Sequence, residues 1–528
     1  MTTDRWRSDP HPSAWAHSCE DDGCIDHSSS RTSARHEPRQ ISRRERNPGA
    51  HPRVGGAKER TGSLLSFAII IRALGSASAS NSGELSNIST SPGSHWVAIA
   101  DSYAIAAARS LQVNLAIALR PLNSTAYPSS YDTLADESAG YVLQVAYNDS
   151  VRGHPTELAF RHLHSVVARL RAREAAQRGL GSTLHACQIC DSSSTGVACR
   201  EDAIMDLLLA ANAEVVDRRI NGGLSSLIQL PGANGPLSPP PASSTCTCGR
   251  WVPPCSYKDA WTALSALLSL LTQWNSRDAE QEAHLRRSIV FTSYALTRVD
   301  GGRCLETTSA WTQHLLPVEV SLSTYVTRLA RIATAFLTVL ASPAPDEIEL
   351  IGEQSPIYDF PSVAEMCGSH GSAVLSAGGL LANNPEHKRT LLLCAHAVAR
   401  QTAPILNVAV HAEVKLLVHW LERNTRYGPA SPLGNYIGST RQPCFACSAF
   451  FNAARKERGA SPEQGDMQQL IYCAPSSLRI HHRWQFPDVA VLNGEGQLDR
   501  VRVERMYKHV RRHFRAEVAY TLGLPPLS

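Results

Sequence analysis

The sequence lacks several features that would place it in familiar classes of protein. It has no apolar run of about 18 residues, the length that a membrane-spanning helix needs, so we expect no transmembrane segment. Its 14 cysteines are scattered over 528 residues, unlike the dense pattern of small disulfide-rich secreted domains. It has no internal repeat of fixed period, which disfavours a solenoid. These absences favour an intracellular protein, cytoplasmic or nuclear, without a membrane partner.

The chain also lacks a strong net charge. A formal charge of +4 on this length is too small to predict nucleic-acid binding by the whole protein. Basic residues nevertheless gather near the C-terminus, and on a helix one face would suit phosphate groups. That face carries Arg505, Lys508, Arg512 and Arg515. The alternative interpretation is a solvated amphipathic helix whose apolar side packs on the domain.

Composition divides the chain into the segments 1–62, 63–95, 96–344 and 345–528. The first is basic and poor in apolar residues, which predicts a disordered tail. The second holds a short apolar run, Leu64–Ile71, interpreted as a buried strand or short helix, followed by a linker. In the third, apolar residues recur every three or four positions, as in Trp96–Leu119, and predict a mainly α-helical domain. A proline-rich excursion interrupts it near 231–257.

The last segment contains two short motifs that carry chemistry. The first is His-Ala-Glu at 411–413, and the second is Pro-Cys-Phe-Ala-Cys at 443–447. Together they supply three groups that zinc accepts as ligands and one carboxylate that need not be a ligand. This is the minimum equipment for a hydrolytic zinc site.

The spacing within each motif fits the start of a helix. Cys444 and Cys447 are three residues apart, so a helix would present both sulfur atoms on one side. Pro443 suits the first turn of such a helix, since its N–H group is not needed there. His411 and Glu413 are two residues apart and can converge only at a helix mouth.

The surrounding pattern alternates between strands and helices. Buried strands are predicted at 405–410, 436–438 and 470–473, with the two motif-bearing helices between them. Such alternation predicts an α/β domain with a mixed, mostly parallel sheet whose carboxyl edge carries the site.

These motifs resemble the zinc-dependent cytidine deaminase-like superfamily, whose signature is H-x-E followed by P-C-x-x-C. The stretches 411–417, 437–439 and 482–484 are similar to a fungal group of deaminase-like proteins thought to act on nucleic acids or bases. The resemblance covers about residues 345–490. It implies a three-layer α/β fold with helices flanking the sheet.

The resemblance also assigns roles to the motif residues. His411, Cys444 and Cys447 would bind Zn²⁺ and leave the fourth position for water. Glu413 would take a proton from that water and deliver it to the ring nitrogen, and would later help to protonate the departing ammonia.

Four further residues are expected to contact the substrate. The main-chain N–H of Ala412 would bind a ring carbonyl, and Trp484 or Phe445 would stack on the base. Asn407 is a candidate contact to the sugar or the base.

The sequence therefore predicts a hydrolytic zinc-dependent deaminase of a cytosine- or adenine-type base, either free or in single-stranded RNA or DNA. The alternative is a catalytically inactive scaffold with the same fold, which binds nucleic acid or protein partners. The sequence does not choose between the two bases, between nucleoside and polymer, or between oligomeric states. Substrate choice depends on the shapes of loops around the pocket.

Overall fold

A computed structural model gives the structure of the chain. The described residues are 56–73, 95–108, 114–122, 140–148, 154–177, 201–227, 257–298, 322–352, 358–361, 384–386, 389, 405–427, 432–459, 471–474, 476–477, 481, 484–487 and 499–521. All of them lie in the unit formed by Pro52–Ser528. The predicted excursion near 231–257 and most of the predicted tail and linker lie outside the described residues.

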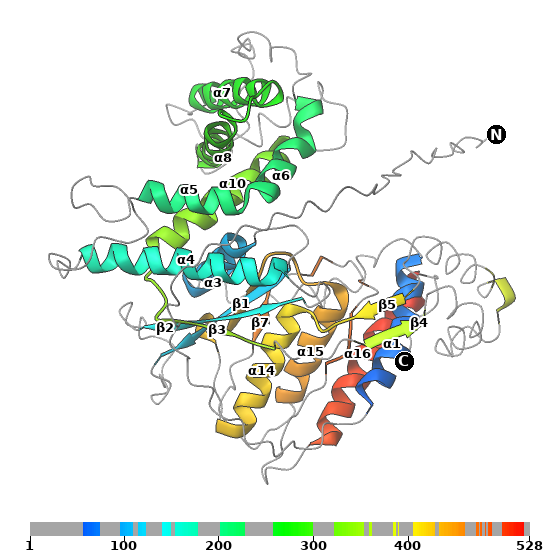
Figure 1. Cartoon of the computed structure of the whole chain (residues 1–528). Helices are drawn as coiled ribbons and strands as arrows, with labels where there is room; N and C mark the ends of the chain where they lie inside the picture. The colour runs from blue at the N-terminus through cyan, green and yellow to red at the C-terminus, as the bar shows by residue number, and fades with distance from the viewer. Residues whose placement is uncertain are drawn as a thin grey trace, which may run out of the picture. The chain divides into compact units, whose positions relative to one another are not determined.

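A five-stranded sheet forms the centre of the fold, in the strand order β3-β2-β1-β6-β7 (Figure 1). Its strands are β1 (Leu115–Pro121), β2 (Tyr141–Tyr147), β3 (Glu347–Leu350), β6 (Tyr436–Ser439) and β7 (Tyr472–Cys473). β1 is antiparallel to both β2 and β6, whereas β2–β3 and β6–β7 are parallel. The sheet is mixed, as predicted, but the expectation that it is mostly parallel is wrong.

Strand β1 corrects the prediction of a helix through Leu119. Helix α3 ends at Ala107, and β1 then pairs Ala116 with Ser439 of β6. The error has a physical cause, because an unbroken apolar run buried on both faces satisfies helical and strand periodicity alike. β1 and β2 precede residue 344, so the sheet takes strands from both sides of the predicted domain boundary.

A second, two-stranded sheet lies beside the first motif. It pairs β4 (Tyr358–Pro361) with β5 (Ile405–Val408) in antiparallel fashion. The strand predicted at 405–410 is thus confirmed, but it does not belong to the five-stranded sheet. Ala409, next along the chain, forms a parallel bridge to Trp484.

One hydrophobic core joins the sheet to the helices that carry the motifs. These helices and their neighbours are α1 (Ala57–Ala73), α14 (Ala412–Tyr427), α15 (Phe445–Gly459) and α16 (Arg500–Thr521). The apolar run at 64–71 is therefore helical, and α1 begins inside the segment that was predicted to be disordered. Phe67 and Ile71 of α1 are buried in the same core as Ala116 and Ala118 of β1.

A second core uses the opposite side of β1. Leu115, Ile117 and Leu119 belong to it, as expected when successive side chains of a strand point to opposite faces. The remaining helices are α3 (His95–Ala107), α4 (His154–Gln177), α5 (Glu201–Ala211), α6 (Ala213–Leu227), α7 (Tyr257–Asn275), α8 (Glu282–Arg298), α10 (Leu322–Ala341) and the short 3₁₀ helix η3 (Leu433–Asn435). The helices predicted at 157–173, 261–274 and 325–340 are confirmed by α4, α7 and α10.

Gly438 lets α3 pack closely on β6. A Cβ atom added at Gly438 would lie 2.6 Å from the carbonyl carbon of Ala100, closer than packed side chains allow. β6 leads directly to the second motif, so this contact helps to fix where that motif lies.

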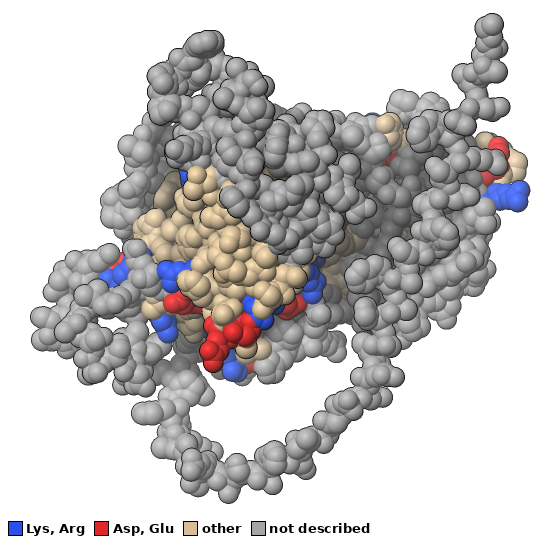
Figure 2. Space-filling view, turned by 90° about the horizontal axis from the view of Figure 1, so that it is seen from above, with Lys and Arg blue, Asp and Glu red and all other residues tan. Residues whose placement is uncertain are grey.

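In the space-filling view of Figure 2, the described surface carries basic and acidic residues together, without a patch of one charge sign. In the view from above, the described acidic and basic side chains are mixed at the edge of a largely uncharged area (Figure 2). Among the described helices, none has both the length and the apolar character needed to cross a membrane.

Candidate metal centre

Both motifs lie where helices begin. The carbonyl of His411 accepts the N–H of Lys415 at 3.0 Å, which makes His411 the residue that starts α14. The carbonyl of Cys444 accepts the N–H of Ser448 at 3.0 Å and starts α15 in the same way. The predicted helix mouths are confirmed. Pro443, however, precedes the helix and is not in its first turn.

The structure brings together the three predicted ligand side chains. His411 Nδ1 lies 3.6 Å from Cys444 Sγ and 3.3 Å from Cys447 Sγ, and the two sulfur atoms are 3.4 Å apart. Tetrahedral zinc with bonds of about 2.0–2.3 Å separates its ligand atoms by roughly 3.5–3.8 Å. The donor set and its spacing therefore fit a zinc ion closely. No other group of three such residues lies together among the described residues.

The hydrogen bond between the two thiols and the charge of His411 make the pKa values of the thiols unequal. Both cysteines are buried and free of disulfides. Burial raises the pKa of Cys444, but the hydrogen bond from Cys447 and the charge of His411 outweigh it and hold this pKa well below its usual value. Burial and the bond with Cys444 place the pKa of Cys447 well above its usual value. The site thus stabilises one thiolate before any metal binds.

Glu413 is the unusual group of the site. Its side chain is buried, and its Oε2 atom has no hydrogen-bond partner among the described residues. Burial raises the pKa of this carboxyl, and the positive charge of His411 opposes the rise. A buried carboxylate oxygen without a partner is costly to fold, so its presence indicates a chemical role.

The N–H of Ala412 is occupied in the structure. It donates to the side-chain oxygen of Asn148 at 2.6 Å, whereas the sequence predicted that it binds a ring carbonyl of the substrate. Asn148 directly follows β2, and its own N–H donates to the carbonyl of Asn114 at 3.0 Å. Sequence reasoning missed Asn148. The available signal was a polar residue at the end of the apolar run Tyr141–Tyr147.

His481 is a second residue that sequence reasoning missed. Its ring makes an edge-to-face contact with His411, with ring centres 5.7 Å apart. His481 is exposed to solvent, whereas the His411 ring that it contacts is buried. It stands next to the predicted His-Arg-Trp stretch at 482–484.

The predicted stacking residues pack as core residues. Phe445 and Trp484 are buried, and both rings contact Phe514 of α16. Asn407 lies in β5 opposite Asp359 of β4. The substrate contacts assigned to these three residues stay predictions.

The basic face of α16 is exposed as expected, while its apolar side packs on α15 and α1. Arg505, Lys508 and Arg512 are exposed and Arg515 is half-buried. Arg505 also forms an ion pair with Glu457 of α15, with the atoms 2.8 Å apart. Phosphate binding by this face stays a prediction.

Comparison with known proteins gives one match. Residues 410–488 match the model of the OTT_1508-like deaminase family, and this segment contains both motifs. No curated protein matches the chain, and no solved structure matches it. The matched segment is therefore similar to deaminases, in agreement with the predicted resemblance.

Proposed function

We propose that the protein is a zinc-dependent hydrolase that deaminates a nucleobase. The observation that carries this proposal is the meeting of one imidazole and two thiols at 3.3–3.6 Å, with Glu413 two residues from the imidazole and one of its carboxylate oxygens without a hydrogen-bond partner among the described residues. A purely structural zinc site has four protein ligands and no use for a free acid. The similarity of residues 410–488 to deaminases supports the same reaction class.

In the proposed reaction, His411, Cys444 and Cys447 would hold the metal. When bound, zinc supplies the Lewis acidity that makes water a nucleophile near neutral pH. Glu413 would accept one proton from the water and donate it to the ring nitrogen, and would then take the second proton from the hydroxyl added to the ring carbon and give it to the leaving amine as the carbonyl forms. Overall, the amino-bearing carbon loses ammonia and gains a carbonyl oxygen from water.

We infer a cytosine- or adenine-type base as the substrate, either free or in a single strand that can present an unstacked base. The exposed basic residues of α16 support a polymer, because they lie on a helix packed directly against α15. The two cores on opposite sides of β1 support the three-layer organisation typical of this fold.

One observation favours a second candidate function. Ala412 N–H is already bonded to Asn148, and the aromatic rings predicted to stack on a base are buried in the core. A protein in which these groups do not contact a substrate would act as a zinc-bound scaffold for nucleic acid or protein partners.

Replacement of Glu413 separates the two functions. In Glu413→Gln we expect ammonia release from cytidine, adenosine or short oligonucleotides to fall by about 10²- to 10⁴-fold, since general acid–base transfer is lost. Zinc content should stay at the wild-type value, because Glu413 is not among the three ligands. The measurement is ammonia formation together with bound zinc per chain.

The matched control is Glu504→Gln, which removes a half-exposed carboxylate from α16. Its ammonia release should equal that of the wild type. If no substrate in the panel gives ammonia that depends on Glu413, the scaffold is the correct function.

A further inference from the structure

Lys415 is a buried lysine one helical turn beyond His411. Residues four apart on a helix share a face, so Lys415 lies on the same side of α14 as the metal ligand. Only 4% of its surface is exposed. Burying an ammonium group is unfavourable unless it is hydrogen-bonded, so the hydrogen bonds of Lys415 indicate its role.

The ammonium group of Lys415 binds the end of strand β2. Its Nζ donates to the carbonyl oxygen of Tyr147 at 2.8 Å, and this contact is fully buried. The side-chain stem of Lys415 runs past Gly352, which lies two residues after the end of β3. Gly352 has a φ of +71°, and an added Cβ would lie 2.9 Å from Lys415 Cδ. A residue without a side chain is therefore needed there for Lys415 to reach Tyr147.

The residue after Tyr147 contacts α14 in turn. The side-chain oxygen of Asn148 accepts the N–H of Ala412 at 2.6 Å, in the first turn of α14. Two hydrogen bonds thus join the end of β2 to α14. One is made by the carbonyl oxygen of Tyr147 and the other by the side chain of Asn148. Ala412 lies between His411 and Glu413, so these two hydrogen bonds hold in place the segment that carries the His411 and Glu413 side chains.

We infer that Lys415 is a positioning residue of the metal centre, which acts through Asn148. Lys415 fixes the Tyr147 carbonyl, the fixed peptide places the Asn148 side chain, and Asn148 holds the start of α14 so that His411 faces the two cysteines. The inference rests on the zinc site of the proposed function. Groups that orient metal ligands without binding the metal commonly change metal affinity by about 10- to 100-fold when they are removed.

Lys415→Met tests this role, because it keeps the stem beside Gly352 and removes the donor. In the full-length protein, we expect the zinc affinity of this variant to be about 10-fold weaker than that of the wild type, as measured by competition with a chelator. Lys415→Arg keeps a cationic donor and should restore part of the affinity. Zinc competition needs no substrate, so it distinguishes failure of this inference from failure of the deaminase proposal.

The matched control is Tyr325→Phe, which also removes one buried bond to a main-chain carbonyl. The Tyr325 hydroxyl donates to Ile220 at 2.9 Å in the helical part of the protein. Its zinc affinity should equal that of the wild type. If Lys415→Met weakens zinc binding no more than Tyr325→Phe, Lys415 only contributes to folding and the inference is wrong.

A double-variant cycle tests the route through Asn148. If Lys415 acts through Asn148, then Lys415→Met should change zinc affinity much less in an Asn148→Ala background than in the wild type. Equal effects in the two backgrounds would show independent action and overturn the inference. A protein that competes for zinc as expected but releases no ammonia from any substrate would leave Lys415 in this role and refute only the deaminase proposal.

Discussion

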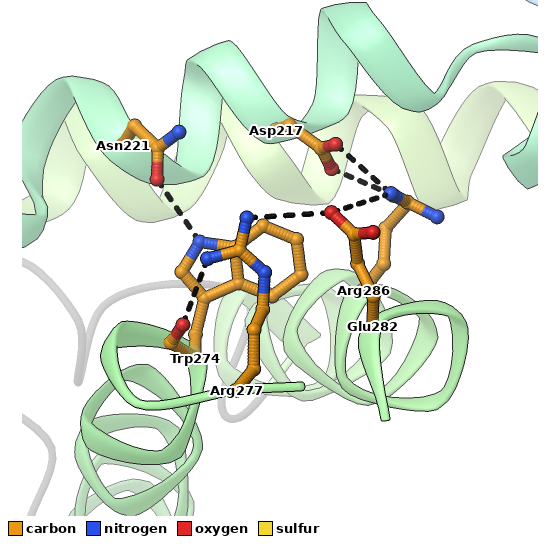
Figure 3. Close-up of polar contacts among 6 residues, drawn as sticks. All are labelled: Asp217, Asn221, Trp274, Arg277, Glu282 and Arg286. Atoms are coloured by element: carbon orange, nitrogen blue, oxygen red, sulfur yellow. Dashed lines mark hydrogen bonds and ion pairs between the residues drawn. The ribbon is translucent and has the colours of Figure 1, made fainter. Parts of the chain in front are cut away.

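Two polar clusters of the molecule differ in burial and in how far their groups are satisfied. At the metal centre, His411 and the two cysteines face one another, and an oxygen of Glu413 has no hydrogen-bond partner among the described residues. In the helical part, a cluster around Trp274 joins α6, α7 and α8 through mutual contacts (Figure 3). The residues of the metal centre are all buried, whereas the cluster around Trp274 includes partly exposed side chains and the exposed Asn221.

The cluster around Trp274 pairs donors with acceptors. Trp274 Nε1 donates to Asn221 at 3.0 Å, and the guanidinium of Arg277 stacks on the indole with its carbon 3.7 Å from the ring centre. Arg286 donates two hydrogen bonds to Asp217, which raise the pKa of its guanidinium. Such matched contacts stabilise packing between helices and leave no group free for reaction.

The difference teaches how to tell a structural cluster from a reactive one. Polar contacts are common to both clusters, so polarity alone does not identify a site. The distinguishing feature is a set of donors and acceptors that remain unmatched until an ion or a substrate binds. Under this view, changes at the metal centre should alter metal binding and activity, whereas changes around Trp274 should alter stability alone.

The largest expected effect tests whether the metal centre can be separated from the rest of the chain. A fragment of residues 345–528 contains all three ligands but lacks β1, β2 and α1. We expect it to be unfolded and to retain no zinc, because β6 loses its partner β1 and the core loses Phe67 and Ala116. A fragment that begins at Pro52 keeps every described element and is the control. Circular dichroism and zinc content decide the result, and a folded, zinc-bound short fragment would refute the account of the sheet.

The next largest effect concerns the cluster around Trp274. Trp274→Ala should lower the free energy of unfolding by about 3–5 kcal/mol, because it removes a fully buried indole and leaves a cavity. Trp274→Phe keeps part of the aromatic system and should cost about 1–3 kcal/mol, mainly because the smaller side chain leaves part of the buried indole site empty. Denaturant unfolding measures both. The folded variants should keep wild-type zinc content, and loss of zinc would mean that the clusters are not independent.

The smallest effect concerns Asp101 of α3, whose hydrogen-bond partner Tyr436 lies in β6. Its carboxylate accepts the Tyr436 hydroxyl at 3.1 Å, and burial raises its pKa although the charge of Arg331 opposes the rise. Because the folded-state pKa lies above the unfolded value, Asp101 contributes most stability at acid pH and loses it as pH rises through the folded-state pKa. The free energy of unfolding of the wild type minus that of Asp101→Asn should therefore fall from about pH 4 upward. A difference that rises with pH would contradict this prediction.

The local part of the site was predictable from the sequence. Three-residue and two-residue spacings act within one helical turn, so they predicted the helix mouths and the candidate ligands His411, Cys444 and Cys447. The strands at 436–438 and 405–410 were also predictable from buried apolar runs.

The contributions from distant parts of the chain were not predictable. Asn148 and Ala412 are 264 residues apart, and no periodic pattern records that they meet. β1 was mistaken for helix because each of its central residues, Leu115 to Leu119, is apolar and buried on one face or the other. The pairing of β1 with β6 is what decides its conformation, and pairing of this kind is a tertiary property.

The most direct test of the metal centre is the zinc content of purified full-length protein. Wild-type protein and Glu413→Gln should each carry one zinc ion per chain, and Cys447→Ser should carry close to none. Equal zinc content in Cys447→Ser and wild type would show that the metal is bound elsewhere, and the account of a zinc centre at His411, Cys444 and Cys447 would be wrong.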